Sequence, residues 1–103
     1  MDNDIITIEL KSFIDESGRL TAMPSKYKKK LVAYYYLSTK FEAERRYSES
    51  EVNDILNEWT MFRDPATLRR ELFVKQLLGR TNDCRWYWKE KEPAFEEFIA
   101  KFI

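Results

Sequence analysis

The sequence predicts an α+β domain that is mainly helical and carries one small β-hairpin. Two segments with helix start signals follow each other, at residues 48–59 and 64–76. An aromatic strand pair with turn-forming residues in its middle follows directly, at residues 77–88. Two helices and a hairpin in this order are typical of a winged helix-turn-helix, with extra helices expected at both ends of the chain.

Length and composition favour one domain with its own core. A chain of 103 residues is long enough to bury a core, and we treat residues 1–103 as a single winged-helix-like unit. Seven Phe, six Tyr and three Trp predict that this core is rich in aromatic rings. Only two Gly and three Pro are present, which fits a mostly helical body.

The first element is expected to be a helix at residues 4–15, with Asp4 as its N-cap. Apolar residues alternate at its start, so a strand is the open alternative. A turn follows at residues 17–19, and Pro24 disfavours helix for the residue before it. The apolar residues at helical spacing are Ile6, Leu10, Phe13 and Ile14.

A long second helix is expected from a cap at Ser25 to about Lys40. Its lysines, at positions 26, 28, 29 and 30, spread around the circumference and favour a solvated face over a phosphate-binding stripe. The predicted inward face consists of Tyr27, Leu31, Tyr34, Ser38 and Phe41, with Leu37 at its edge.

The next helix has a strong start signal. Residues 46–47 are expected to form a short strand, after which Ser48 and Glu51 fit a capping box. Apolar residues then recur at helical spacing and predict one buried stripe. They are Val52, Ile55, Leu56 and Trp59.

Asp64 followed by Pro65 predicts the start of a helix at residues 65–76, because proline at the first helical position loses no hydrogen bond. Leu68, Leu72 and Phe73 are expected to hold it to the core. Strands are predicted at residues 77–81 and 85–88, around a turn at 82–83. Pro93 opens a last helix at 93–103, which packs either on its own chain or on a second copy.

Basic residues of the helix at 65–76 and of the hairpin are candidates for contacts with double-stranded DNA. Arginine on a helix in the major groove can donate two hydrogen bonds to guanine or contact phosphates. The helix offers Thr67, Arg70 and Lys75, and the hairpin at residues 77–88 adds Arg80 and Arg85.

Arg69 is predicted to have a structural role instead. On a helical wheel it falls between Leu72 and Phe73, on the side that faces the core. We expect an ion pair with an acidic residue of the preceding helix, which would orient the two helices more than stabilise them.

The charge balance supports an alternative in which the fold binds protein. Lys plus Arg and Asp plus Glu both total 18, so the net charge attracts no polyanion. The helix at 48–59 presents acids that would repel phosphates. A protein partner or a homodimer is therefore the alternative, and an apolar-ligand sensor has less support. The acids are Glu49, Glu51, Asp54 and Glu58.

Catalysis, metals and cofactors are not expected. The chain has no histidine, and its single cysteine, Cys84, lies beside the hairpin turn and is expected to be a plain free thiol. No nucleophile is paired with a base, and no glycine loop fits a phosphate. Apolar runs are too short for a membrane span and the first residues are acidic, so we expect a cytoplasmic protein.

Blocks along about residues 12–88 have the order and spacing of a known family. They include Arg46-Tyr47-Ser48-Glu49, Leu68-Arg69-Arg70-Glu71-Leu72 and Leu78-Gly79-Arg80, together with residues 13–20, 23–26, 29–30, 51–53 and 87–88. In these blocks the chain resembles the bacterial domain of unknown function 2087.

The resemblance implies a winged-helix-like domain without established biochemistry. Members occur alone or behind helix-turn-helix domains of arsenic-repressor-like regulators, which implies a link to transcription regulation by fusion only. Two positions differ from the family pattern. Gln76 stands where a glycine often ends the helix that corresponds to residues 65–76, and Cys84 where Asp-Gly usually turns the hairpin.

Overall fold

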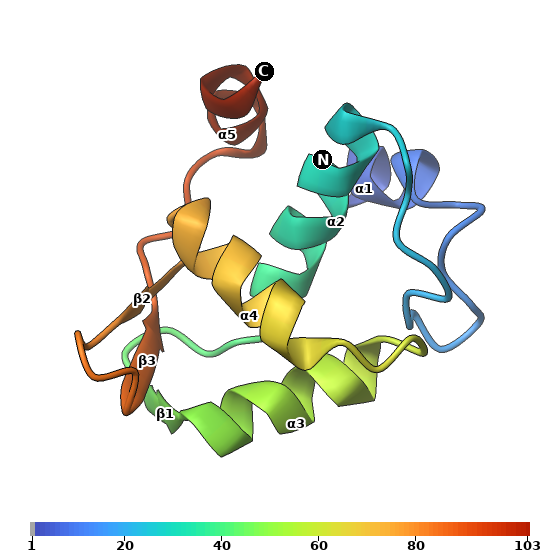
Figure 1. Cartoon of the computed structure of the whole chain (residues 1–103). Coiled ribbons are helices and arrows are strands. Elements are labelled where there is room, and N and C mark those ends of the chain that lie inside the picture. The colour runs from blue at the N-terminus through green and yellow to red at the C-terminus, as the bar shows by residue number, and fades with distance from the viewer. Residues whose placement is uncertain (1) are drawn as a thin grey trace.

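The computed structural model describes residues 2–103, with side chains from residue 5 onward. Five helices and three strands follow one another over this part of the chain (Figure 1). The elements are α1 (Asp2–Glu9), α2 (Tyr27–Ser38), β1 (Arg46–Ser48), α3 (Glu49–Trp59), α4 (Pro65–Val74), β2 (Leu78–Arg80), β3 (Trp86–Lys89) and α5 (Phe95–Phe102).

The three strands form one antiparallel sheet in the order β1-β3-β2. Tyr87 of β3 pairs with Tyr47 of β1, and Trp88 pairs with Gly79 of β2. The Trp88 indole covers Gly79 so closely that a Cβ there would lie 2.3 Å from Nε1, which requires glycine. The sequence α2-β1-α3-α4-β2-β3 is consistent with a winged-helix-like arrangement, and the predicted α+β class is confirmed.

Helix α2 lies at the centre of the core. Leu31, Val32, Ala33 and Leu37 have no exposed surface, because α1, α4 and α5 all pack on this helix (Figure 1). Full burial of a Val or Leu side chain contributes roughly 1.5 to 3 kcal/mol. The helix is therefore buried around most of its circumference, rather than on the single face that the sequence predicted.

Helix α5 packs on its own chain. The ring of Tyr35 contacts Phe95 at a centroid distance of 5.3 Å, and its hydroxyl donates to the carbonyl of Pro93 at 2.7 Å. Phe98 is also buried against Tyr35. The helix starts after Ala94 as its N-cap, so Pro93 precedes the helix rather than opening it.

The first predicted helix was too long and misplaced. Helix α1 already begins at Asp2, so Asp4 is not its N-cap, and it ends at Glu9. The strand alternative was wrong. Beyond the helix, the carboxylate of Asp15 accepts backbone N–H bonds from Ser17 and Arg19, which turns the chain away from helical geometry.

Ser25 does not cap α2. The N-cap residue is Lys26, whose side chain makes no capping hydrogen bond because an ammonium group accepts none. The helix is held instead by the burial of its apolar residues and by a contact at its start. Lys29 Nζ donates to the carbonyl of Glu9 at 3.0 Å and lies 3.7 Å from its carboxylate.

Helix α3 has side-chain caps at both ends. The predicted capping box is confirmed, with Glu51 N–H to Ser48 Oγ at 3.1 Å and Ser48 N–H to Glu51 Oε1 at 2.8 Å. The Ser48 N–H holds the pKa of Glu51 below its ordinary value. The bond therefore stabilises the fold above that ordinary value and is lost as the pH falls through the lowered pKa. At the other end Arg19 donates to the carbonyls of Glu58 and Thr60, both at 2.9 Å.

Helix α4 begins as predicted, with Asp64 accepting the N–H of Thr67 and Pro65 in the first turn. It ends in a Schellman motif, in which the N–H of Leu77 binds the carbonyl of Leu72 at 2.9 Å and the N–H of Gln76 binds that of Phe73 at 3.0 Å. Gln76 takes the left-handed conformation, φ 63°, that glycine usually adopts at this position.

Removing the Ser48 hydroxyl should destabilise the domain through α3. Ser48→Ala loses the acceptor for Glu51 N–H, and we expect a cost of about 1 kcal/mol in urea unfolding. Ser50, exposed in the same first turn, provides the matched control, and Ser50→Ala should change stability by less than about 0.5 kcal/mol. Equal effects of the two variants would contradict the role of the capping box.

Gln76→Gly should be more stable than Gln76→Ala by about 1 kcal/mol, because glycine relieves the left-handed backbone strain. Both variants lose the contact between the Gln76 side chain and Lys101, so their difference isolates the backbone term. Thermal and urea unfolding measure it. If alanine were as stable as glycine, the positive φ would carry no cost.

Candidate functional site

The exposed side of α4 and the β2–β3 hairpin enclose a cavity of about 310 Å³. Three of its side chains are arginines, and none is acidic. Two come from α4 and one from β2, so the cavity exists only because the hairpin folds back along the helix (Figure 1). Its lining consists of Ala66, Arg69, Arg70, Phe73, Arg80, Cys84 and Tyr87.

Arg69 is held from the side of α3. Its guanidinium lies 3.7 Å from the carboxylate of Glu49 and donates to the side-chain oxygen of Asn53. It also lies 6.0 Å from the ring centre of Tyr87, and only 17% of its side chain is exposed. The acidic partner on the preceding helix is therefore Glu49, and Arg69 connects α4 to both α3 and β3.

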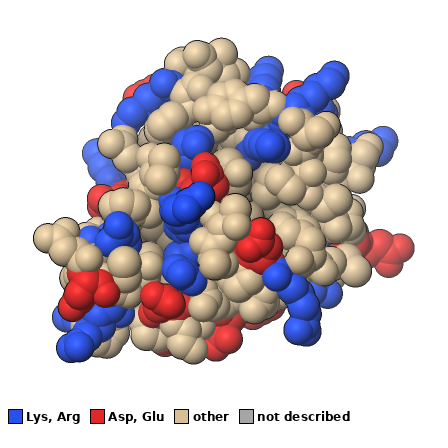
Figure 2. All heavy atoms as spheres, in the orientation of Figure 1, with Lys and Arg blue, Asp and Glu red and all other residues tan. Residues whose placement is uncertain are grey.

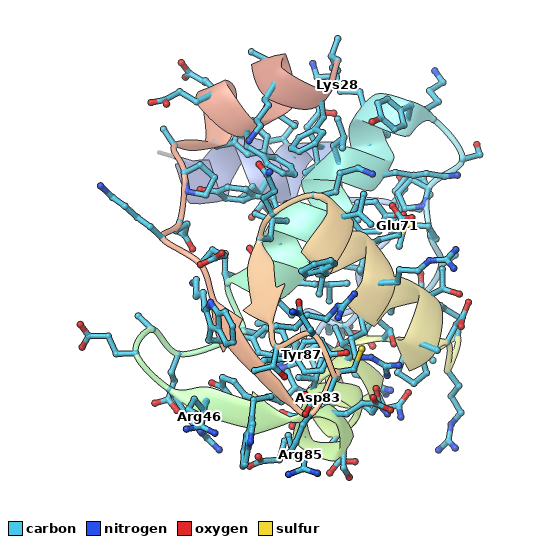
Figure 3. The ribbon with its side chains drawn as sticks, turned by 60° about the vertical axis from the view of Figure 1, so that its left-hand side comes forward. Lys28, Arg46, Glu71, Asp83, Arg85 and Tyr87 are labelled. Atoms are coloured by element: carbon cyan, nitrogen blue, oxygen red, sulfur yellow. The ribbon has the colours of Figure 1, made fainter. Side chains whose placement is uncertain are left out.

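Tyr87 forms the floor of the cavity. It is 3% exposed and points inward from the hairpin beneath α4 (Figure 3). The pKa of its phenol is raised by burial, and the nearby charge of Arg69 offsets only part of that rise. The alternation of β3 thus buries Tyr87 and leaves the two tryptophans half-buried on the outer side. There Trp86 is covered by the guanidinium of Arg46 at 4.2 Å.

Arg70 and Thr67 lie on the exposed side of α4. In the part of the chain that the structure describes, Arg70 forms no ion pair or hydrogen bond. The apolar side chain of Val74 is exposed one turn further along. The exposed stripe of α4 therefore combines one free cation with a small apolar surface.

Arg80 reaches back from β2 to α4. Its guanidinium lies 4.2 Å from the ring centre of Phe73 and donates to the carbonyl of Thr81 at 3.0 Å. Cation–π stacking of this kind fixes the orientation of the arginine and contributes about 0.5 to 1 kcal/mol where it is exposed. No carboxylate lies within ion-pair distance of Arg80 among the described residues, so its charge stays available.

Asp83 organises the turn of the hairpin. Its carboxylate accepts the hydroxyl of Thr81 at 2.6 Å and the N–H of Arg85 at 3.0 Å. The Thr81 hydroxyl, followed by the Arg85 N–H, lowers the pKa of Asp83. Cys84 closes the turn with a bond from its N–H to the Thr81 carbonyl, and its φ of 60° is left-handed. The thiol is free and partly buried.

The side chain of Arg85 points away from the cavity and the domain (Figure 3). It is 75% exposed, and the only contact to a carboxylate in the described chain is a long one of 4.0 Å to Asp83. The predicted hairpin contacts are therefore of two kinds, with Arg80 in the cavity and Arg85 at the tip.

Lys75 lies apart from this group, and the DNA contact expected from its position in the sequence stays a prediction. Its ammonium lies 2.9 Å from the carboxylate of Glu71, and its side chain is only 11% exposed. The rings of Tyr34 and Phe102 cover it at 5.7 Å. The helix ends just before Lys75, so the side chain turns toward α2 and α5 instead of continuing the exposed stripe.

The charges on this side of the molecule are mixed. Basic side chains gather in the middle of the face, over α4 and beside the hairpin (Figure 2). Acidic side chains lie among them and along the edge formed by α3. The positive region is therefore local, as the zero net charge requires.

A family described as an uncharacterized protein conserved in bacteria (DUF2087) matches residues 19–89. The chain belongs to this family. The matched region of this DUF2087 member starts at Arg19, which caps α3, and ends at Lys89, the last residue of β3, so it contains the cavity and its whole lining. No curated protein and no solved structure matches the chain. None of the described helices of this DUF2087 domain is both long and apolar enough to cross a membrane.

Phe73 and Cys84 were not assigned to this site by the sequence analysis. Phe73 was assigned to the core, but its ring also supports Arg80. Cys84 was assigned to the turn alone, but it lines the cavity. The left-handed backbone at Cys84 sets the direction of its side chain, and no local spacing in the sequence indicates it.

The two adjacent arginines of α4 should differ in their effect on stability. Arg69→Ala removes the contacts to Glu49 and Asn53 and should cost about 1 to 2 kcal/mol in urea unfolding. Arg70→Ala is the matched control and should change stability by less than about 0.5 kcal/mol. A larger loss for Arg70→Ala than for Arg69→Ala would overturn the division of roles.

Proposed function

We propose that this domain is a non-catalytic regulatory module that binds double-stranded DNA through α4 and the β2–β3 hairpin. The observation that carries the proposal is the pair of guanidiniums, Arg70 and Arg80, that face the same cavity without carboxylate partners in the described chain. Thr67 on α4 and Arg85 at the hairpin tip extend this surface on either side.

The arrangement fits a duplex because helix and hairpin supply different contacts. A helix of ten residues, such as α4, fits into a major groove with its exposed stripe toward the bases. The exposed Arg85 at the hairpin tip is then free to contact a neighbouring phosphate, which positions the protein without reading sequence. Arg70 is the residue with the reach and freedom to contact a base.

The acidic face of α3 opposes DNA less than its sequence suggests. Glu49 is paired with Arg69, and Glu51 lies 3.3 Å from Arg45 while it also caps the helix. Two of the four carboxylates are thus partly neutralised at the start of α3. Asp54 and Glu58 stay exposed further along the helix.

Protein binding by the same face is the second candidate. It is favoured by the 53% exposure of Val74, an apolar side chain at the C-terminal end of the exposed stripe of α4. A protein partner would cover Val74 together with Arg70. In that case the domain would not bind duplex DNA with the salt dependence expected of phosphate contacts.

DNA binding is tested by fluorescence anisotropy with a labelled duplex of mixed sequence, between about 50 and 200 mM salt. We expect binding at the low end that weakens steeply, with a log–log slope of about −0.9 per phosphate contact. No binding at the low end, or binding without a salt slope, would reject the proposal.

Charge-removing variants locate the interface. Arg70→Ala and Arg85→Ala should each weaken binding, and loss of a phosphate contact should reduce the salt slope by about 1. Lys28→Ala removes one exposed positive charge at the opposite end of the molecule (Figure 3) and should leave affinity nearly unchanged. If Lys28→Ala weakened binding as much as Arg70→Ala, the contact would be diffuse and not located on α4.

A further inference from the structure

The cavity between α4 and the hairpin has the charge of a small-ligand site. Its wall carries three arginines, of which only Arg69 has a carboxylate within ion-pair distance. The nearest acid of the hairpin, Asp83, does not line the cavity and is engaged by Thr81 and Arg85. Two positive charges therefore face a concave surface without compensation from the described residues.

Two of the three guanidiniums at this cavity are held in place before any ligand arrives. Arg80 is stacked on Phe73 at 4.2 Å, and Arg69 is fixed by Glu49 and Asn53. A guanidinium fixed in this way loses little conformational freedom when it donates to an oxyanion. Only Arg70 has to become ordered on binding, so the cost of assembling the site is low.

The volume of the cavity suits a compact anion. About 310 Å³ exceeds the size of a phosphate group and leaves room for water or for a small substituent against Phe73 and Tyr87. Paired N–H groups of arginine match the geometry of phosphate oxygens, which is the reason that arginine predominates at such sites.

We infer that this cavity is a binding site for a phosphate oxyanion, with Arg70 and Arg80 as its ligating residues and Arg69 as the residue that positions the wall. The phosphate is either that of a small soluble compound or one in the backbone of DNA. The site does not depend on DNA binding, although the proposed DNA-binding surface shares Arg70 and Arg80.

Cys84 supplies a reporter inside the cavity. It is the only cysteine of the chain, and its partly buried thiol lines the same wall as the arginines. The rate at which the neutral reagent 4,4′-dithiodipyridine modifies it can be followed at constant ionic strength. A bound anion should shield the thiol and slow that reaction.

Inorganic pyrophosphate is the first probe. We expect saturable protection of Cys84, reaching about tenfold at a concentration about ten times the dissociation constant, while sodium chloride of equal ionic strength gives none. Arg70→Gln and Arg80→Gln should each weaken the protection, and Lys28→Gln should leave it unchanged. Circular dichroism establishes that each variant is folded, and broadening of the pyrophosphate signal in ³¹P NMR measures binding without the thiol.

A second arm, with mixed-sequence duplex DNA, separates the sources of the phosphate. Protection by pyrophosphate supports a soluble phosphate compound, and protection by the duplex alone supports the DNA backbone. The inference is overturned if neither ligand protects Cys84. It is also overturned if Arg70→Gln and Arg80→Gln are protected as strongly as the unmodified protein. Duplex binding seen by anisotropy, with Cys84 protected neither by the duplex nor by pyrophosphate, would overturn the cavity site and leave the proposed function standing. Protection by pyrophosphate without duplex binding would do the reverse.

Discussion

The side chain of Arg69 connects the three elements on which the site depends. It reaches from α4 to Glu49 and Asn53 of α3 and lies beside the ring of Tyr87 in β3. A mostly buried charge is costly unless its donors are used, so the position of α4 is restricted to the one that satisfies this guanidinium. The angle between α4 and the hairpin, and with it the shape of the cavity, follows from that restriction.

Two turns of the domain adopt a left-handed backbone without glycine. Gln76 and Cys84 both have left-handed backbone conformations, with φ near 60°, at the positions that end α4 and turn the hairpin. For residues other than glycine each such conformation costs roughly 1 to 2 kcal/mol. The surrounding bonds impose it, through the Schellman motif at Gln76 and the Thr81–Asp83 turn at Cys84. At Cys84 the result is a side chain that faces the cavity.

Electrostatics at this face are local and not a property of the whole chain. Positive and negative side chains are equal in number, and most arginines and lysines near the site have a partner, as Lys75 has in Glu71. At physiological salt, screening is weakest within about 8 Å. Over this range the cavity is positive, because Arg70 and Arg80 lack carboxylates within ion-pair distance. Specific anion contacts are therefore compatible with a neutral protein.

The sequence by itself determined the elements whose signals are local. The capping box at Ser48, the Asp64-Pro65 start of α4 and the aromatic hairpin all appear where residue spacing predicts them, because their bonds join residues a few positions apart. Interactions distant in sequence were decided only by the tertiary structure. Helix α2 is buried on almost all sides because three other helices pack on it. The cavity lies between α4 and the hairpin. The hairpin folds back because Tyr87 packs beneath the helix, and no spacing of residues along the chain encodes that packing.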